Sequence, residues 1–117
     1  MKREYKDYFQ DILDSIVDIE EFTKNMDLDS FVNDRKTFKA VVKSVEIIGE
    51  AAKKIPDAIK GKYTSIEWNK MAGMRDKLIH EYFGIDNEIL WQTVKEDIPP
   101  LKPLVEKVMK DMEKSEL

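Results

Sequence analysis

Three side chains in the second half of the chain could act together on a phosphate. They are Arg75, His80 and Tyr82, and His80 is the only histidine in the sequence. Histidine titrates near neutral pH and is the usual general acid or base. Arginine can hold a phosphate through two hydrogen bonds and stabilise developing charge, and tyrosine offers a hydroxyl that can be modified. An ion-pairing surface with one aromatic ring at the edge of the core remains the alternative interpretation of the same spacing.

A helix over this segment would separate the three side chains. At about 100° per residue, Arg75 and Tyr82 share one face, whereas His80 projects about 140° away from Arg75. If the stripe of Met71, Leu78 and Tyr82 forms the core of the bundle, His80 points out of its own core. Asp76 would then lie one turn before His80 and could hold the imidazole in one tautomer and raise its basicity. This geometry favours a homodimer in which Arg75 and His80 of both copies line one cleft.

Periodic apolar residues predict four helical segments that would position this site. Residues that form turns or end helices separate them. The turn over 27–30 offers an N-cap, and Pro56 ends the second segment. We expect Gly84 to cap the end of the third segment and Asp86 to cap the start of the fourth. Gly49 lies among small residues in the second segment and would let another helix approach closely. The expected segments are Arg3–Met26, Ser30–Ile55, Glu67–Phe83, and a last one from Asn87 to about Met112 that is kinked or broken at Pro99-Pro100.

Length and composition agree with a small helical protein. The chain has 117 residues, 42% of them hydrophobic and 38% charged, with four glycines and four prolines. No alternation typical of strands is evident, and the few turn residues leave room only for short loops. We therefore expect one domain over residues 1–117 with an all-α fold, an up-down four-helix bundle.

The distribution of charge bears on the partners of the chain. Its net charge of −4 disfavours tight, sequence-independent binding of nucleic acid, so RNA would require a local basic patch. Lys53, Lys54 and Lys77 are the candidate RNA-contacting residues. The lysines at 53, 54, 60 and 62 fit a phosphate-contacting rim and residues kept for solubility equally well. Acidic residues on one face of the first helix are interpreted as solvated surface rather than as a metal site.

Segments that would direct the chain elsewhere are not evident. The absence of cysteine excludes disulfides and thiolate metal sites. The first residues lack the apolar stretch of a signal peptide, and no apolar run is long enough to span a membrane. A cytoplasmic protein is the simplest expectation, and nothing in the sequence calls for a metal or a cofactor.

Beyond these three residues, the whole chain resembles a known family. It is similar, from about residue 3 to 110, to the HEPN domain superfamily and specifically to the HepT-like toxins that accompany small nucleotidyltransferase antitoxins. The family motif Arg-x4-His-x-Tyr is matched by Arg75, His80 and Tyr82, with a polar residue after the arginine, here Asp76. Flanking segments match as well, at 48–53, 72–76, 81–86, Trp91 and 97–101.

This resemblance implies a specific activity and specific partners. It implies a homodimeric four-helix bundle that cleaves RNA as a metal-independent endoribonuclease, by attack of the ribose 2′-OH on the adjacent phosphorus. His80 would move the proton and Arg75 would stabilise the charge on phosphorus. It also implies a type VII-like toxin–antitoxin pair, in which an MntA-like minimal nucleotidyltransferase transfers AMP to Tyr82. The added phosphate beside Arg75 would then exclude RNA.

Two other functions remain open. The chain could be a non-catalytic HEPN partner, or substrate-binding subunit, of a nucleotidyltransferase, which its acidic charge would suit. It could also be a HepT-like enzyme that acts on another nucleotide, such as a dinucleotide cofactor, although no glycine-rich phosphate loop supports this.

Overall fold

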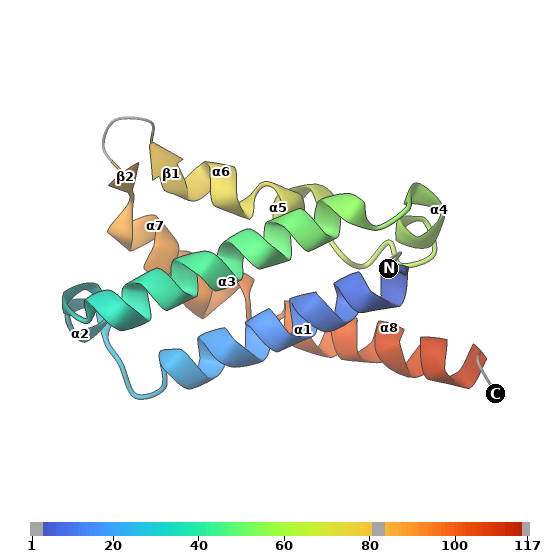
Figure 1. Cartoon of the computed structure of the whole chain (residues 1–117), viewed down its shortest axis with the longest axis horizontal. Helices are drawn as coiled ribbons and strands as arrows, with labels where there is room; N and C mark the ends of the chain where they lie inside the picture. The colour runs from blue at the N-terminus through green and yellow to red at the C-terminus, as the bar shows by residue number, and fades with distance from the viewer. Residues whose placement is uncertain (1–3, 81–83, 116–117) are drawn as a thin grey trace.

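Two long antiparallel helices form the centre of the computed structural model, with the remaining helices packed around them (Figure 1). The structure describes residues 4–80 and 84–115, with residues 78–80 and 115 described by their backbone alone. The elements, in chain order, are α1 Tyr5–Phe22, α2 Leu28–Asn33, α3 Arg35–Lys54, α4 Asp57–Lys60, α5 Trp68–Ala72, α6 Met74–Leu78, β1 Ile79–His80, β2 Gly84–Ile85, α7 Asn87–Gln92, the π-helix η1 Thr93–Asp97, and α8 Leu101–Ser115. The prediction of an all-α fold class is confirmed, although the described residues also include one short pair of strands, β1 and β2.

The core lies where the apolar stripes of α1, α3 and α8 meet. Each stripe repeats every three or four residues, which places its members on one face of a helix. Because these side chains are almost completely shielded from water, their burial is the main favourable contribution to folding. The fully buried members of the three stripes include Phe9, Ile12, Ile16, Val41, Val45, Ile48 and Val105.

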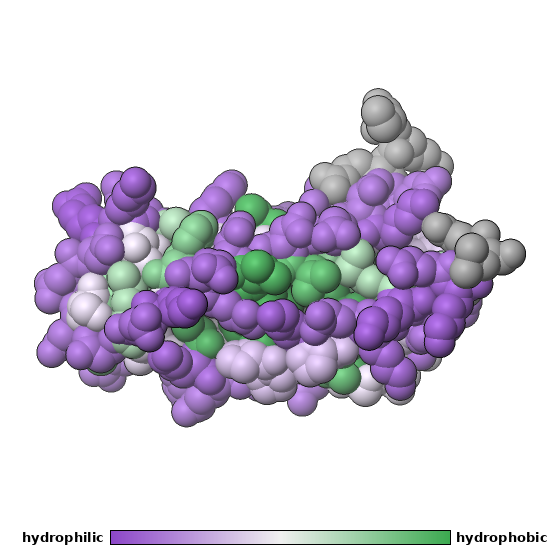
Figure 2. Space-filling view, turned by 90° about the horizontal axis from the view of Figure 1, so that it is seen from below, coloured by the Kyte–Doolittle hydropathy of each residue, from purple (hydrophilic) through white to green (hydrophobic). Residues whose placement is uncertain are grey.

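Opposite the core, the outer face over α1 and α8 is mostly hydrophilic. A band of hydrophobic side chains crosses this face (Figure 2). An ion pair between Lys102 Nζ and Glu20 Oε2, at 2.9 Å, joins the two helices there. None of the described helices combines the length and apolar character that crossing a membrane requires.

The second predicted helix is in fact two helices. The turn over 27–30 does provide an N-cap, because Asp27 accepts a hydrogen bond from the backbone N–H of Ser30. Asp34 then interrupts the helical backbone, with φ −93° and ψ 88°, and caps α3 by accepting from the N–H and the hydroxyl of Thr37. These hydrogen bonds lower the pKa of Asp34 because they stabilise its carboxylate. The prediction of one helix from Ser30 to Ile55 is therefore wrong: this local cap ends α2 and starts α3.

A break at the two prolines is confirmed in the last predicted segment. The helix from Asn87 continues only as a π-helical turn, in which the N–H of Ile98 donates to the carbonyl of Thr93 at 3.0 Å. Pro99 and Pro100 have no N–H to donate, and α8 begins immediately after them. Asp97, 15% exposed, pairs with Lys70 Nζ at 3.3 Å and links η1 to α5.

Gly49 brings the site-bearing segment close to the centre of the bundle. A Cβ atom at Gly49 would meet the carbonyl oxygen of Ala72 at 3.3 Å, closer than nine in ten real contacts of this kind. A side chain at this position would require α5 to shift by a few tenths of an ångström, so glycine favours the close approach of α5 to α3. The expectation that small residues in α3 admit a neighbouring helix is confirmed at this position.

Candidate active site

Arg75 lies on the outer side of the short helix α6, whose inner side packs on the core. The neighbouring side chains of Met71 and Met74 are 1% and 4% exposed and hold α5 and α6 on the core. Gly73 separates these two helices. With its neighbour Met74 buried, the Arg75 side chain points outward and is 45% exposed. Arg75 is thus rigidly placed at its base and open to a ligand at its tip.

Two carboxylates lie near the Arg75 guanidinium without using up its hydrogen bonds. Glu46 of α3 approaches Nε at 3.8 Å, and Asp76 approaches Nη1 at 3.7 Å. Both distances exceed that of a hydrogen bond, and within the described part of the chain Arg75 donates none. Partly exposed pairs of this kind contribute little to stability. The guanidinium therefore retains donors that could bind a phosphate in the two-pronged manner typical of arginine.

His80 lies in an extended strand, where the sequence predicted a helix. α6 ends at Leu78, and β1 then pairs antiparallel with β2, with Ile79 opposite Ile85 and His80 opposite Gly84 (Figure 1). Gly84 has φ +75°, a conformation that L side chains rarely adopt. We attribute the early end of the helix to this glycine and to the β-branched Ile79 and Ile85, which favour a strand pair.

Three predictions drawn from a helix over 67–83 are consequently wrong. Arg75 and His80 are not related by helical rotation, so the expected angle of about 140° between them does not apply. Asp76 does not lie one helical turn before His80, and its described partner is Arg75. Gly84 belongs to a strand rather than to a helix C-cap, whereas the predicted cap at Asp86 is confirmed by a 3.0 Å bond from the Ile89 N–H.

Tyr82, the third residue of the motif, lies outside the described residues. Its prediction as a modification site rests on the sequence alone. The backbone on either side is placed, since β1 ends at His80 and β2 begins at Gly84. The motif thus bridges α6 and the connection between two paired strands.

The predicted RNA-contacting lysines lie in two places. Lys77 is exposed on α6, two residues after Arg75. Lys53 and Lys54 lie in the last turn of α3, where Lys53 is 3.8 Å from Glu50 and Lys54 lies over the ring of Tyr8. Glu46, which pairs with Arg75, lies about two turns before these two lysines on α3. Their contact with RNA remains a prediction.

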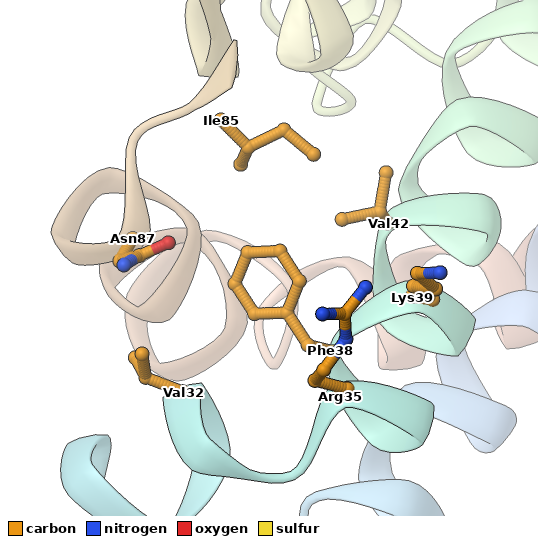
Figure 3. Close-up of a pocket in the computed structure, with 7 residues that line it drawn as sticks. All are labelled: Val32, Arg35, Phe38, Lys39, Val42, Ile85 and Asn87. Atoms are coloured by element: carbon orange, nitrogen blue, oxygen red, sulfur yellow. The ribbon is translucent and has the colours of Figure 1, made fainter. Parts of the chain in front are cut away.

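The start of α3 provides basic residues that the sequence did not single out. Arg35 and Lys39, with Asn87 and four apolar residues, line a cavity beside β2 (Figure 3). A spacing of four residues on one helix face was the available signal. It could be interpreted only once β2 was known to pack there. Among the described residues, no three histidines or carboxylates converge as metal ligands would.

Fold and site together define a class: a small helical bundle with an exposed arginine on one helix and a histidine in the adjoining hairpin. The family model for ribonuclease HepT-like proteins matches residues 12–108. The chain belongs to this family.

Similar proteins of known sequence span nearly the whole chain. A protein of Thermococcus cleftensis named a probable ribonuclease HepT is 54% identical over 94% of this chain and 100% of its own length. A protein of Methanocaldococcus jannaschii named as a candidate RNase is 49% identical, over 96% of this chain and 93% of its own. Another of that description, from Caldanaerobacter subterraneus, is 40% identical over 87% and 91%. No solved structure matches the chain significantly.

Proposed function

We propose that this protein is an endoribonuclease that cleaves RNA without a metal ion, by attack of a ribose 2′-oxygen on the adjacent phosphorus. The observation that carries the proposal is Arg75, exposed and with unused donors at the base of the hairpin that contains His80. The family of the chain and the names of its relatives support the same activity.

The reaction can be assigned to these two side chains. The 2′-oxygen forms a bond to phosphorus, the bond from phosphorus to the 5′-oxygen breaks, and a 2′,3′-cyclic phosphate and a 5′-hydroxyl result. An imidazole of His80 accepts the proton of the 2′-hydroxyl, and an imidazolium returns a proton to the leaving 5′-oxygen. Arg75 stabilises the negative charge that accumulates on the phosphate oxygens between these steps.

A homodimer would supply both the base and the acid. Each chain has one histidine, so two imidazoles at one phosphate require two copies. A C2 dimer brings identical segments together around its axis. This argument is one of proton balance and does not depend on the helical geometry that the structure overturned. Sedimentation equilibrium should give the mass of two chains, and a stable monomer would contradict this part of the proposal.

The regulation that we propose acts on Tyr82. In a toxin–antitoxin pair, a nucleotidyltransferase antitoxin would join the Tyr82 oxygen to the α-phosphorus of ATP, releasing pyrophosphate. The new phosphodiester carries a negative charge seven residues from Arg75. By occupying the guanidinium and repelling RNA, it would silence the nuclease.

The activity is tested on the product ends. The purified chain, incubated with single-stranded RNA and excess EDTA, should leave 2′,3′-cyclic phosphate and 5′-hydroxyl termini, because the nucleophile is the 2′-oxygen. An RNA with 2′-deoxy sugars at the cleaved positions serves as the matched control and should remain intact. Cleavage of that control, or complete dependence on added Mg²⁺, would contradict the proposal.

Modification is tested by intact mass. Co-expression with a minimal nucleotidyltransferase should add whole AMP units to the wild-type chain and none to Tyr82→Phe. Tyr63→Phe is a suitable control because Tyr63 is half-buried and distant in sequence. RNA cleavage by the modified protein should fall to background. A modified chain that remains fully active would contradict the regulatory role.

The acidic net charge of −4 favours one competing function, a non-catalytic subunit of a nucleotidyltransferase. That function predicts a stable complex with the transferase and no cleavage by the isolated chain. The product assay above separates the two.

A further inference from the structure

A cavity of about 410 Å³ opens beside the hairpin that contains His80. It lies between the end of α2, the first turns of α3, β2 and the start of α7 (Figure 3). Its lining is Val32, Arg35, Phe38, Lys39, Val42, Ile85 and Asn87. A hollow of this size is within the usual range for small-molecule sites.

The ring of Phe38 forms one wall of this cavity and is supported by other aromatic rings. Phe38 is half-buried and packs on Phe31 with ring centroids 5.4 Å apart, and Phe31 packs in turn on Trp91 at 5.0 Å. Figure 3 shows the Phe38 ring facing the space below Ile85 and Val42. A ring supported in this way can receive a flat apolar ligand without losing further side-chain freedom. Stacking on aromatic rings is how proteins hold bases of single-stranded nucleic acids.

The charge of the cavity is opposite to that of the protein. Its two ionisable side chains, Arg35 and Lys39, are both cationic and exposed, and within the described part of the chain neither forms an ion pair. Like charges four residues apart on a helix repel, and cations near a helix N-terminus oppose its dipole. Both effects cost stability, and an anion bound between the two side chains would relieve them.

The cavity lies on the same face of α3 as Glu46, the residue that pairs with Arg75. Arg35, Lys39, Val42 and Glu46 follow one another at intervals of four, three and four residues and so share one face of α3. Glu46 lies at the Arg75 end of this face, about 10 Å along the helix axis from Lys39. On the other side, Ile85 of the cavity pairs with Ile79, the neighbour of His80. One short stretch of single-stranded RNA could therefore touch both places.

We propose that this cavity binds one nucleotide of the RNA, close to the phosphate that is cleaved. The base stacks on Phe38, the amide of Asn87 faces its polar edge, and Arg35 and Lys39 hold the adjoining phosphate. The inference rests on the proposed ribonuclease function. A second copy of the chain fits the cavity less well, because burying two unpaired cations in an apolar contact is costly.

The test is RNA binding in the absence of cleavage. A fluorescein-labelled oligouridine of twelve nucleotides is titrated into His80→Ala protein, and anisotropy gives Kd at several salt concentrations. Adding Arg35→Gln and Lys39→Gln should raise Kd at least about tenfold. It should also reduce the magnitude of the slope of log K against log salt by about 0.7, since one phosphate is no longer neutralised. The matched control is Lys107→Gln with Lys110→Gln on α8, which removes the same charge and should leave both quantities nearly unchanged.

The ring is tested separately. Phe38→Leu keeps an apolar side chain but removes stacking, and should raise Kd about tenfold, whereas Phe38→Tyr keeps the ring and should bind like the parent. Thermal melting identifies any variant that fails to fold. If Phe38→Leu does not fold, the Kd of Phe38→Tyr is compared with that of the parent protein. Equal Kd values for the two double variants, or no binding by His80→Ala protein, would overturn the proposal.

Two further outcomes separate this inference from the proposed function. If wild-type protein cleaves RNA but the cavity variants bind and cleave as the control does, the cavity assignment alone is wrong. If the cavity variants lose binding but wild-type protein never cleaves, the nuclease proposal fails and the cavity assignment stands. If the cavity variants, without RNA, form an assembly of different mass from that of the parent protein, the cavity is an interface between copies. That result would overturn the assignment.

Discussion

His80→Ala should reduce RNA cleavage by about a hundredfold to ten-thousandfold, the range that a positioned general acid or base contributes. No other histidine can substitute for it. Because both proton transfers would depend on this imidazole, the upper part of the range is expected. If the wild-type chain acts as a toxin on expression, the growth inhibition should disappear with the activity. Initial rates on a labelled RNA, at saturating protein and single turnover, measure the effect directly.

The controls separate proton transfer from a structural role. His80→Gln keeps a polar side chain that can hydrogen-bond but does not titrate near neutral pH, and should be as inactive as His80→Ala. Both variants should melt close to the wild-type temperature. Near-normal cleavage by either one would remove His80 from the mechanism.

Mixing wild-type and His80→Ala chains tests whether two histidines act at one site. If subunits exchange freely, about a quarter of the dimers in an equal mixture contain two wild-type chains. The mixture contains twice as many dimers as the same amount of wild-type protein alone. Its activity should therefore fall to about half of the activity of that wild-type protein. Activity unaffected by the added variant would show that each chain works by itself.

Arg75→Ala should reduce cleavage by about a hundredfold to a thousandfold, which is the usual loss when one stabilising donor of a transition state is removed. Stability should change little, because the side chain is 45% exposed and its two ion pairs lie at 3.7 and 3.8 Å. Arg75→Lys should recover only part of the rate, since an ammonium cannot form the two parallel bonds that a guanidinium forms. The loss should fall mainly on the rate at saturation rather than on RNA affinity.

Glu46→Gln is the matched control for Arg75. It removes the charge partner from α3 but leaves the guanidinium in place. If Arg75 acts on the phosphate, this variant should cleave at least about as fast as wild type. If Arg75 serves only to hold α6 against α3, Glu46→Gln should reproduce the defect of Arg75→Ala, and the catalytic assignment would be wrong.

Local signals in the sequence were sufficient for most of the helical framework. The buried face of α1 and the N-caps at Asp27 and Asp86 follow from patterns within a few residues, and all three are present. The break at Pro99-Pro100 was predictable for the same reason, since proline lacks the N–H that a helix requires. Asp34 was overlooked because the free energies of a helix that continues through it and of one that is capped there differ little, and the apolar stripe runs past it.

The candidate site was less predictable than the framework. The sequence identified Arg75 and His80 as the reactive pair because their chemistry depends on residue type. It could not place them relative to each other, since helix and strand compete over 79–85 and the outcome depends on the pairing of β1 with β2. Periodicity alone therefore assigned the wrong geometry to His80.

The sequence by itself determined the helical class, the family motif and the identity of the residues that can do chemistry, because these depend on side chains and on contacts within one or two turns. Only the tertiary structure decided that the motif bends from α6 into a hairpin, that Glu46 lies beside Arg75, and that Arg35 and Lys39 share a cavity with Ile85. The last two of these contacts join segments that lie 29 to 50 positions apart in the chain. Glu46 and Arg75 come together because α5 and α6 pack closely on α3 at Gly49 and bury Met71 and Met74.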